Sequence, residues 1–184
     1  MVTVSEQEQR KSLIEQFNEV RSRTLELVKT LEKDDFVVQT APYMSPPKWH
    51  IGHVSWVFEA ILSKIDTNYE FYSKEFSEYL NSYYQQFGAP HDKAKRGIIS
   101  RPTVEQIFEY FDLINQRITD FLQKISLSEN DTRLIQMGFH HECQHQELLV
   151  YDLQHLLAEQ YRPVKKNSPP SPSLTEPSSV KISG

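Results

Sequence analysis

Residues 140–147 of this chain are His140-His141-Glu142-Cys143-Gln144-His145-Gln146-Glu147, at the centre of the helical pattern that decides the fold. The pattern predicts a helix that opens near Asn130 or Asp131 and runs to about Glu159. Its predicted inner stripe is Leu134, Met137, His141, His145, Leu148 and Asp152. Two histidines therefore replace core residues on a stripe that faces inward.

Three further segments show helical spacing of apolar residues. The first covers about 5–33 and opens at a capping box. The second covers about 46–65, with Ser45 as its predicted N-cap and Pro46 in its first turn. The third opens at Thr103 and carries a clean apolar face, and a short helix is predicted around 74–85. Four long helices with connections of short or medium length predict an all-α, antiparallel four-helix bundle.

Composition separates this bundle from the end of the chain. We expect residues 1–162 to form the domain and residues 163–184 to form a flexible tail or interdomain linker. The reason is that ten of the seventeen residues from Ser168 to Gly184 are serine or proline.

Charge and hydropathy exclude several classes of protein. The net charge of −5 without a basic run argues against a nucleic-acid binder. The sequence contains no apolar stretch of the ~20 residues that span a bilayer, and its N-terminus lacks the pattern of a secretory signal. The single cysteine, Cys143, cannot form an internal disulfide. These features favour a cytoplasmic protein.

A metal site is the chemistry that the histidines indicate. His141 and His145 are four residues apart, so a helix projects both from one face and two imidazoles can bind one metal ion. His53 is the candidate third ligand, because it shares a helix face with Trp49 and Trp56. We expect His50, one position round, to face the helix edge or solvent.

Two other interpretations of this segment remain open from the residues alone. His141 to His145 matches the HExxH pattern of zinc peptidases, in which Glu142 would activate water. No strand pattern accompanies it, which argues against that class. The simplest alternative is that both histidines are ordinary helix residues, although buried imidazoles would then need other partners.

The loop around residues 88–97 carries a second candidate site. Lys93, Lys95 and Arg96 are either a solvated charge run or a clamp for the carboxylates of an anionic substrate. We expect Cys143 to face away from the metal and to serve as a small packing residue.

Three separated motifs together resemble one family. They are residues 45–53 (Ser-Pro-Pro-Lys-Trp-His-Ile-Gly-His), residues 91–102 around Lys93 and Arg96, and residues 140–149. Over roughly residues 10–162 the chain is similar to the N-terminal DinB-like domain of the sulfoxide synthases of ergothioneine and ovothiol biosynthesis, the hercynine oxygenase family.

The resemblance implies an iron(II) enzyme domain that forms a C–S bond with O2. By matching motifs, His53, His141 and His145 would bind non-haem Fe(II), and Gln144 would contact the betaine substrate hercynine. Lys93 and Arg96 stand where the family has two arginines that bind the carboxylates of γ-glutamylcysteine or cysteine. Lysine keeps the charge but lacks the bidentate fork of arginine.

The family enzymes also carry a second domain, similar to formylglycine-generating enzymes, which supplies a catalytic tyrosine. This chain ends in the Ser/Pro-rich segment where that domain would begin, so we expect the domain in cis or in trans and assign no catalytic acid here. The alternatives are a standalone DinB-like thiol transferase or hydrolase that uses a divalent metal, and a non-catalytic metal-binding remnant.

Overall fold

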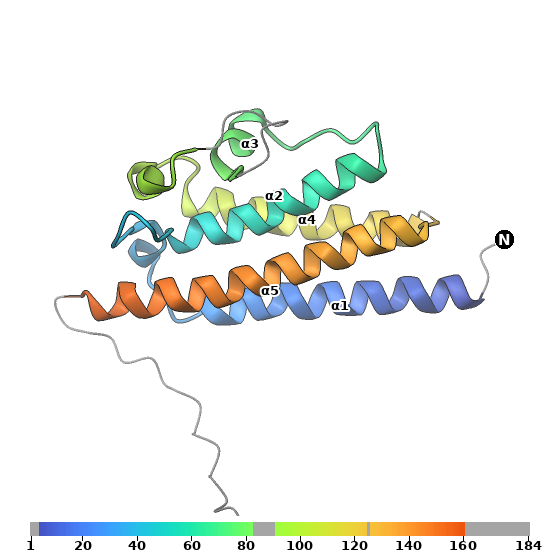
Figure 1. Ribbon diagram of the computed structural model, residues 1–184, viewed down its shortest axis with the longest axis horizontal. Coiled ribbons are helices and arrows are strands. Elements are labelled where there is room, and N and C mark those ends of the chain that lie inside the picture. Colours follow the sequence, from blue (N-terminus) through green and yellow to red (C-terminus); the bar gives the residue numbers. More distant parts are fainter. Residues whose placement is uncertain (1–3, 83–90, 125, 161–184) are drawn as a thin grey trace, which may run out of the picture.

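The structure is a computed structural model that describes residues 4–82, 91–124 and 126–160, and it is built from helices (Figure 1). No strand occurs within these residues. The four long helices are α1 (Val4–Val28), α2 (Pro47–Ile65), α4 (Val104–Lys124) and α5 (Glu129–Ala158). Within the described parts of the connections lie three shorter helices: η1 (Lys33–Val37), α3 (Lys74–Leu80) and η3 (Lys93–Ile98). The all-α prediction is confirmed, whereas the predicted tail of 163–184 lies outside the described residues.

The directions of the four long helices correct the predicted antiparallel order. In Figure 1, α1 and α5 run side by side in the same direction, and α2 and α4 run together in the opposite direction. The contacts agree, because Gln9 near the start of α1 hydrogen-bonds Thr132 near the start of α5. The connection between α2 and α4, which includes α3 and η3, returns the chain to the end of the bundle where α2 began.

Helix α2 begins one residue later than predicted. Its N-cap is Pro46, and Pro47 is the first helical residue, which suits proline because the first N–H of a helix needs no intrahelical partner. Ser45 is therefore not the cap. Its backbone N–H instead donates to the Asp152 carboxylate at 3.0 Å, and its hydroxyl accepts from the Arg96 guanidinium at 2.8 Å.

Helix α2 lies at the centre of the fold and is buried on all sides. Every residue from Pro47 to Leu62 is buried, because α3, α4, α5 and η1 all pack against this helix. A close approach to α5 occurs at Gly138, where an added Cβ would lie 2.7 Å from the Phe58 ring and 2.8 Å from a methyl group of Ile61. The two helices that carry the candidate ligands are thus tightly packed.

The buried face of α5 differs from the predicted inner stripe. Met137 is 46% exposed and Leu148 is 45% exposed, while the buried residues in the same region are Gly138, Phe139, Glu142, Gln146 and Leu149. The buried arc is rotated because α5 packs against both α1 and α2. His141 and His145 are half-buried at the edge of this arc.

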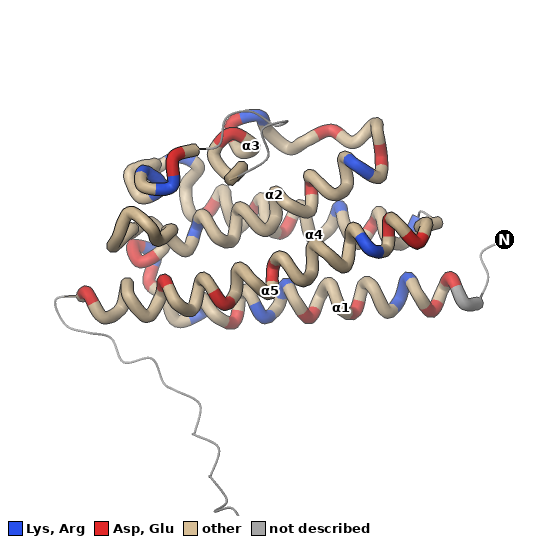
Figure 2. The backbone as a smooth tube through the Cα atoms, viewed as in Figure 1, with Lys and Arg blue, Asp and Glu red and all other residues tan. Residues whose placement is uncertain are grey.

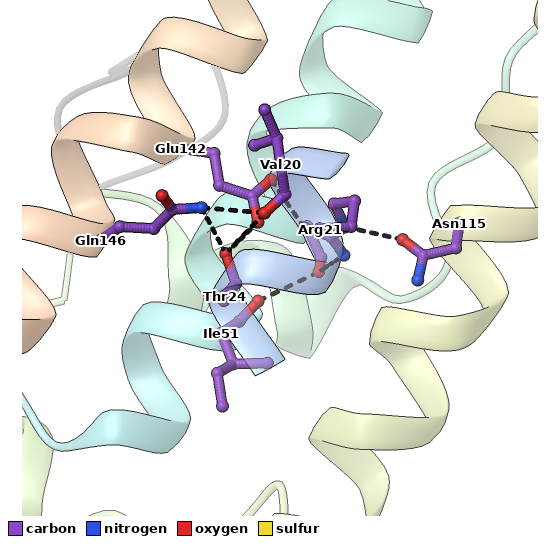
Figure 3. Close-up of polar contacts among 8 residues, drawn as sticks. Val20, Arg21, Thr24, Ile51, Asn115, Glu142 and Gln146 are labelled. Atoms are coloured by element: carbon purple, nitrogen blue, oxygen red, sulfur yellow. Dashed lines mark hydrogen bonds and ion pairs between the residues drawn. The ribbon is translucent and has the colours of Figure 1, made fainter. Parts of the chain in front are cut away.

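Charged residues of both signs are interspersed along α1, whereas α5 carries mainly acidic residues, with Arg133 near its start as its one lysine or arginine (Figure 2). One buried polar cluster joins all four long helices (Figure 3). In it Arg21 of α1 forms an ion pair with Glu142 of α5 at 3.1 Å, and its guanidinium also donates to Ser55 of α2 and Asn115 of α4.

Among the described residues, no helix is both long enough and apolar enough to cross a bilayer.

Candidate metal centre

Three histidines from two helices meet at one point. His53 comes from α2, and His141 and His145 come from α5. One ring nitrogen from each lies within 4.8 Å of the others, which is the arrangement needed to hold a single metal ion. Imidazole nitrogens suit zinc, copper, iron and nickel, so the donors alone do not identify the metal.

The surroundings of His53 present one of its nitrogens to this point. Its Nδ1 lies 2.6 Å from the Leu80 carbonyl oxygen, which can only accept a hydrogen bond. Nδ1 therefore carries the proton, and the lone pair of Nε2 is free for a metal. The Trp49 ring stacks on the His53 ring with centroids 4.5 Å apart, so the imidazole is held in both position and tautomer.

The prediction that His50 faces the helix edge or solvent is wrong. It is only 3% exposed, since α2 has neighbours on every side. Its Nδ1 lies 3.1 Å from Nδ1 of His145, and its Nε2 lies 2.9 Å from the Asp152 carboxylate. The sequence did carry a signal for Asp152, which is seven residues beyond His145 and so on the same helix face.

Burial keeps the three candidate ligands in the form that binds metals. It lowers the pKa of His141 to about 4. It also lowers the pKa values of His53 and His145 well below the usual value, and the neighbouring imidazoles lower them further. The rings are therefore neutral at physiological pH, each with a free lone pair.

These pKa shifts predict that the metal-free protein loses stability in mild acid. The pKa of His141 is about 4 in the folded state against 6.5 for an ordinary histidine, so between these values the unfolded chain binds more protons. The stabilising contribution of these neutral histidines is fully present above pH 6.5. The free energy of unfolding then falls as the pH decreases towards 4, by up to about 1.4 kcal/mol per pH unit for each such group. Urea unfolding at a series of pH values measures this slope, which we expect to be shallower in His141→Gln. If that substitution leaves the slope unchanged, the lowered pKa of His141 is not the cause of the pH dependence.

The other predicted site residues surround the same point. A cavity of about 350 Å³ is lined by the three histidines together with Gln144, Lys93 and Arg96. Gln144 and Lys93 are exposed at the surface, whereas Arg96 is buried. The cavity is also lined by two exposed aromatic residues that the sequence analysis did not single out, Tyr43 and Tyr151.

Arg96 is held rigidly beside the histidines. Its guanidinium carbon lies 3.3 Å from the centroid of the Trp49 ring, the ring that also stacks on His53. Gln39 fastens the segment that carries Arg96, since its amide donates to the Lys93 carbonyl at 2.8 Å and its amide oxygen accepts from the Gly97 N–H at 2.6 Å. A cation is thus fixed next to the candidate metal centre.

The HExxH interpretation does not fit the geometry. Glu142 is fully buried, and its carboxylate pairs with Arg21 and accepts from the Thr24 hydroxyl at 2.5 Å. These partners belong to α1, and Glu142 does not line the cavity that contains the histidines. It is therefore not placed to activate a water molecule there. Cys143, as expected, is absent from the cavity lining too.

One buried atom tests whether the donor set fits a metal. Nδ1 of His141 is buried and lacks a hydrogen-bond partner among the described residues. Buried imidazole nitrogens without a partner are costly in the absence of a ligand. The neutral donors, their convergence and this unpartnered nitrogen all fit a divalent metal ion.

The sequence matches the DinB superfamily over residues 16–149. The chain belongs to the DinB superfamily. The match spans both helices of the candidate metal centre and includes His53, His141, His145 and the segment with Lys93 and Arg96. No match to a curated protein was found. The match therefore identifies the superfamily and specifies neither a metal nor an activity.

Proposed function

We propose that this DinB domain is the iron-binding domain of a sulfoxide synthase, which uses O2 to join the sulfur of a small cysteine-containing thiol to a hercynine-like betaine. The observation that supports this most is the composition of one cavity. Three neutral histidines, the cations Lys93 and Arg96, and the amide of Gln144 all line it. A site for a redox metal and an anionic thiol needs this combination.

Each residue has a distinct part in the proposal. His53, His141 and His145 would hold the metal, and all three line the cavity in which the substrates would bind. Bound iron(II) supplies the redox chemistry with O2 and a binding position for sulfur. Arg96 and Lys93 attract the carboxylates of the thiol, and the volume of about 350 Å³ suits small molecules. Gln144 donates or accepts hydrogen bonds at the betaine. A domain similar to formylglycine-generating enzymes, in cis or in trans, would complete the site.

A second candidate function uses the same residues. It is a DinB-type thiol transferase or hydrolase that employs Zn(II) or Ni(II). The observation in its favour is that the candidate ligands and both cations come from one bundle, so a metal and an anionic thiol need nothing from another domain. A metal-binding remnant without activity is the third outcome that an experiment must separate.

The proposal is tested by loading the protein anaerobically with Fe(II), adding nitric oxide and recording the iron–nitrosyl EPR signal with and without hercynine. We expect hercynine to change the signal of the wild-type protein and to have less effect in Gln144→Leu. Gln154→Leu is the matched control, since Gln154 is an exposed glutamine of α5 that does not line the cavity. A signal that ignores hercynine, together with preference for Zn(II) or Ni(II), would favour the transferase. The absence of any iron signal would exclude the iron site.

A further inference from the structure

A chain of hydrogen bonds leads away from the metal centre through His145. Nδ1 of His145 lies 3.1 Å from Nδ1 of His50, and Nε2 of His50 lies 2.9 Å from Oδ2 of Asp152. The same Oδ2 accepts the backbone N–H of Ser45 at 3.0 Å. His50 and Asp152 are not among the three candidate ligands, which are His53, His141 and His145.

The end of this chain fixes the direction of its hydrogen bonds. A carboxylate oxygen accepts hydrogen bonds, so Nε2 of a neutral His50 must carry its proton and donate to Asp152. Nδ1 of His50 is then an acceptor. Nδ1 of His145 must donate to it, which leaves the lone pair of His145 on Nε2. This is the tautomer that a metal ligand coordinating through Nε2 requires.

The hydrogen-bonded chain lies along the wall of the cavity, with a buried residue at its middle and half-buried residues at its two ends. His50 is 3% exposed. The Asp152 side chain is 11% exposed, and its carboxylate accepts a hydrogen bond from the Ser45 backbone N–H, which ties it to the segment just before α2. While both imidazoles are neutral, these hydrogen bonds have one satisfied arrangement, because reversing any donor leaves two hydrogens or two lone pairs facing each other.

We infer that His50 and Asp152 are positioning residues that set the tautomer and orientation of the ligand His145 through this hydrogen-bonded chain. For His53 the Leu80 carbonyl does the equivalent work directly. Asp152 and His145 both lie on α5, and His50 of α2 connects their side chains by hydrogen-bonding to both. The inference rests on the metal site of the proposed function but not on its reaction or substrates.

The first test needs no substitution and no metal. Long-range ¹H–¹⁵N correlation NMR of the metal-free wild-type protein reports which ring nitrogen of each histidine is protonated. We expect the proton of His145 on Nδ1 and that of His50 on Nε2. A proton on Nε2 of His145 would overturn the inference, whatever the protein does with metals.

The second test measures Co(II) affinity. Removing a hydrogen-bonding partner of a ligand typically weakens metal binding about 10–100-fold, and we expect this loss for His50→Phe and for Asp152→Ala. Asp152→Asn keeps an acceptor oxygen and is expected to restore most of the affinity. His155→Phe is the matched control, because it removes another half-buried histidine hydrogen bond of α5, the one to Thr40.

The outcomes separate this inference from a merely structural contact and from failure of the metal site. If His50→Phe and Asp152→Ala bind Co(II) as tightly as the wild type, the two residues only join α2 to α5 and the inference is wrong. If the wild type binds no Co(II), the metal site itself fails, while the NMR result still decides the tautomer. If His50→Phe does not fold, the comparison of Asp152→Ala with Asp152→Asn decides.

Discussion

Replacing His53 by alanine is expected to abolish tight metal binding while the helical fold remains. His53 is the single candidate ligand on α2, so its loss leaves only His141 and His145, a pair on one helix. Two ligands hold a divalent ion far more weakly than three. Loss of a hydrogen bond to a metal ligand weakens binding by up to ~100-fold. Because His53 would be a ligand itself, we expect its loss to lower the affinity for Co(II) or Fe(II) by more than that.

The same substitution should reduce the stability that the metal adds. A ligand present at 1,000 times its Kd stabilises a protein by about 4.1 kcal/mol. If the affinity falls at least ~100-fold, the same metal concentration adds about 1.4 kcal/mol or less. Urea unfolding with and without Co(II) measures both values. His140→Ala is the control, since His140 is exposed on the same helix as the remaining ligands. Equal metal-dependent stabilisation in His53→Ala and the wild type would contradict the three-histidine site.

The cluster of three histidines shows what spacing along one helix can predict. The four-residue interval between His141 and His145 requires only a helix, and the structure places both rings at one point. His53 was found because it shares a face with two tryptophans. The faces on which these residues lie could be predicted because they depend on local helix geometry, and the structure brings the three rings together, while metal binding stays a prediction.

The failures have the opposite cause, because they depend on the number and direction of neighbouring helices. His50 is buried since α2 is surrounded, a fact that no periodicity within α2 reveals. Met137 and Leu148 are exposed because α5 faces two helices whose positions the pattern does not encode. The parallel course of α2 and α4 depends on the path of a long connection, whose length does not specify its direction.

Glu142 is the residue at which motif and structure disagree most. The motif would place its carboxylate at a metal, whereas the structure places it against Arg21, Thr24 and the interior of the bundle (Figure 3). Arg21 is itself almost fully buried and lies with its guanidinium carbon 3.4 Å from the centroid of the Phe111 ring. Burial lowers the pKa of Arg21, and the charge of Glu142 opposes that shift. The carboxylate therefore balances a charge that has no access to water.

We accordingly expect Glu142→Gln to destabilise the protein strongly. Removing one partner of a buried ion pair costs about 3–5 kcal/mol, a large part of the roughly 5–15 kcal/mol that stabilises a typical domain. Urea unfolding of the metal-free protein measures the loss. Glu129→Gln is the matched control, because Glu129 pairs with Arg133 on the exposed side of the same helix and should cost less than about 1 kcal/mol.

The double substitution Arg21→Met with Glu142→Leu should recover part of this loss, because it removes both charges together. Recovery is incomplete, since Ser55, Asn115 and Thr24 lose hydrogen-bond partners. The folded fraction of Glu142→Gln should still bind Co(II) with nearly the wild-type affinity, because its side chain does not line the cavity. His53→Ala loses the metal and keeps the fold, and Glu142→Gln keeps the metal and loses stability. The reverse order of damage would restore the peptidase interpretation and remove the basis for the iron site.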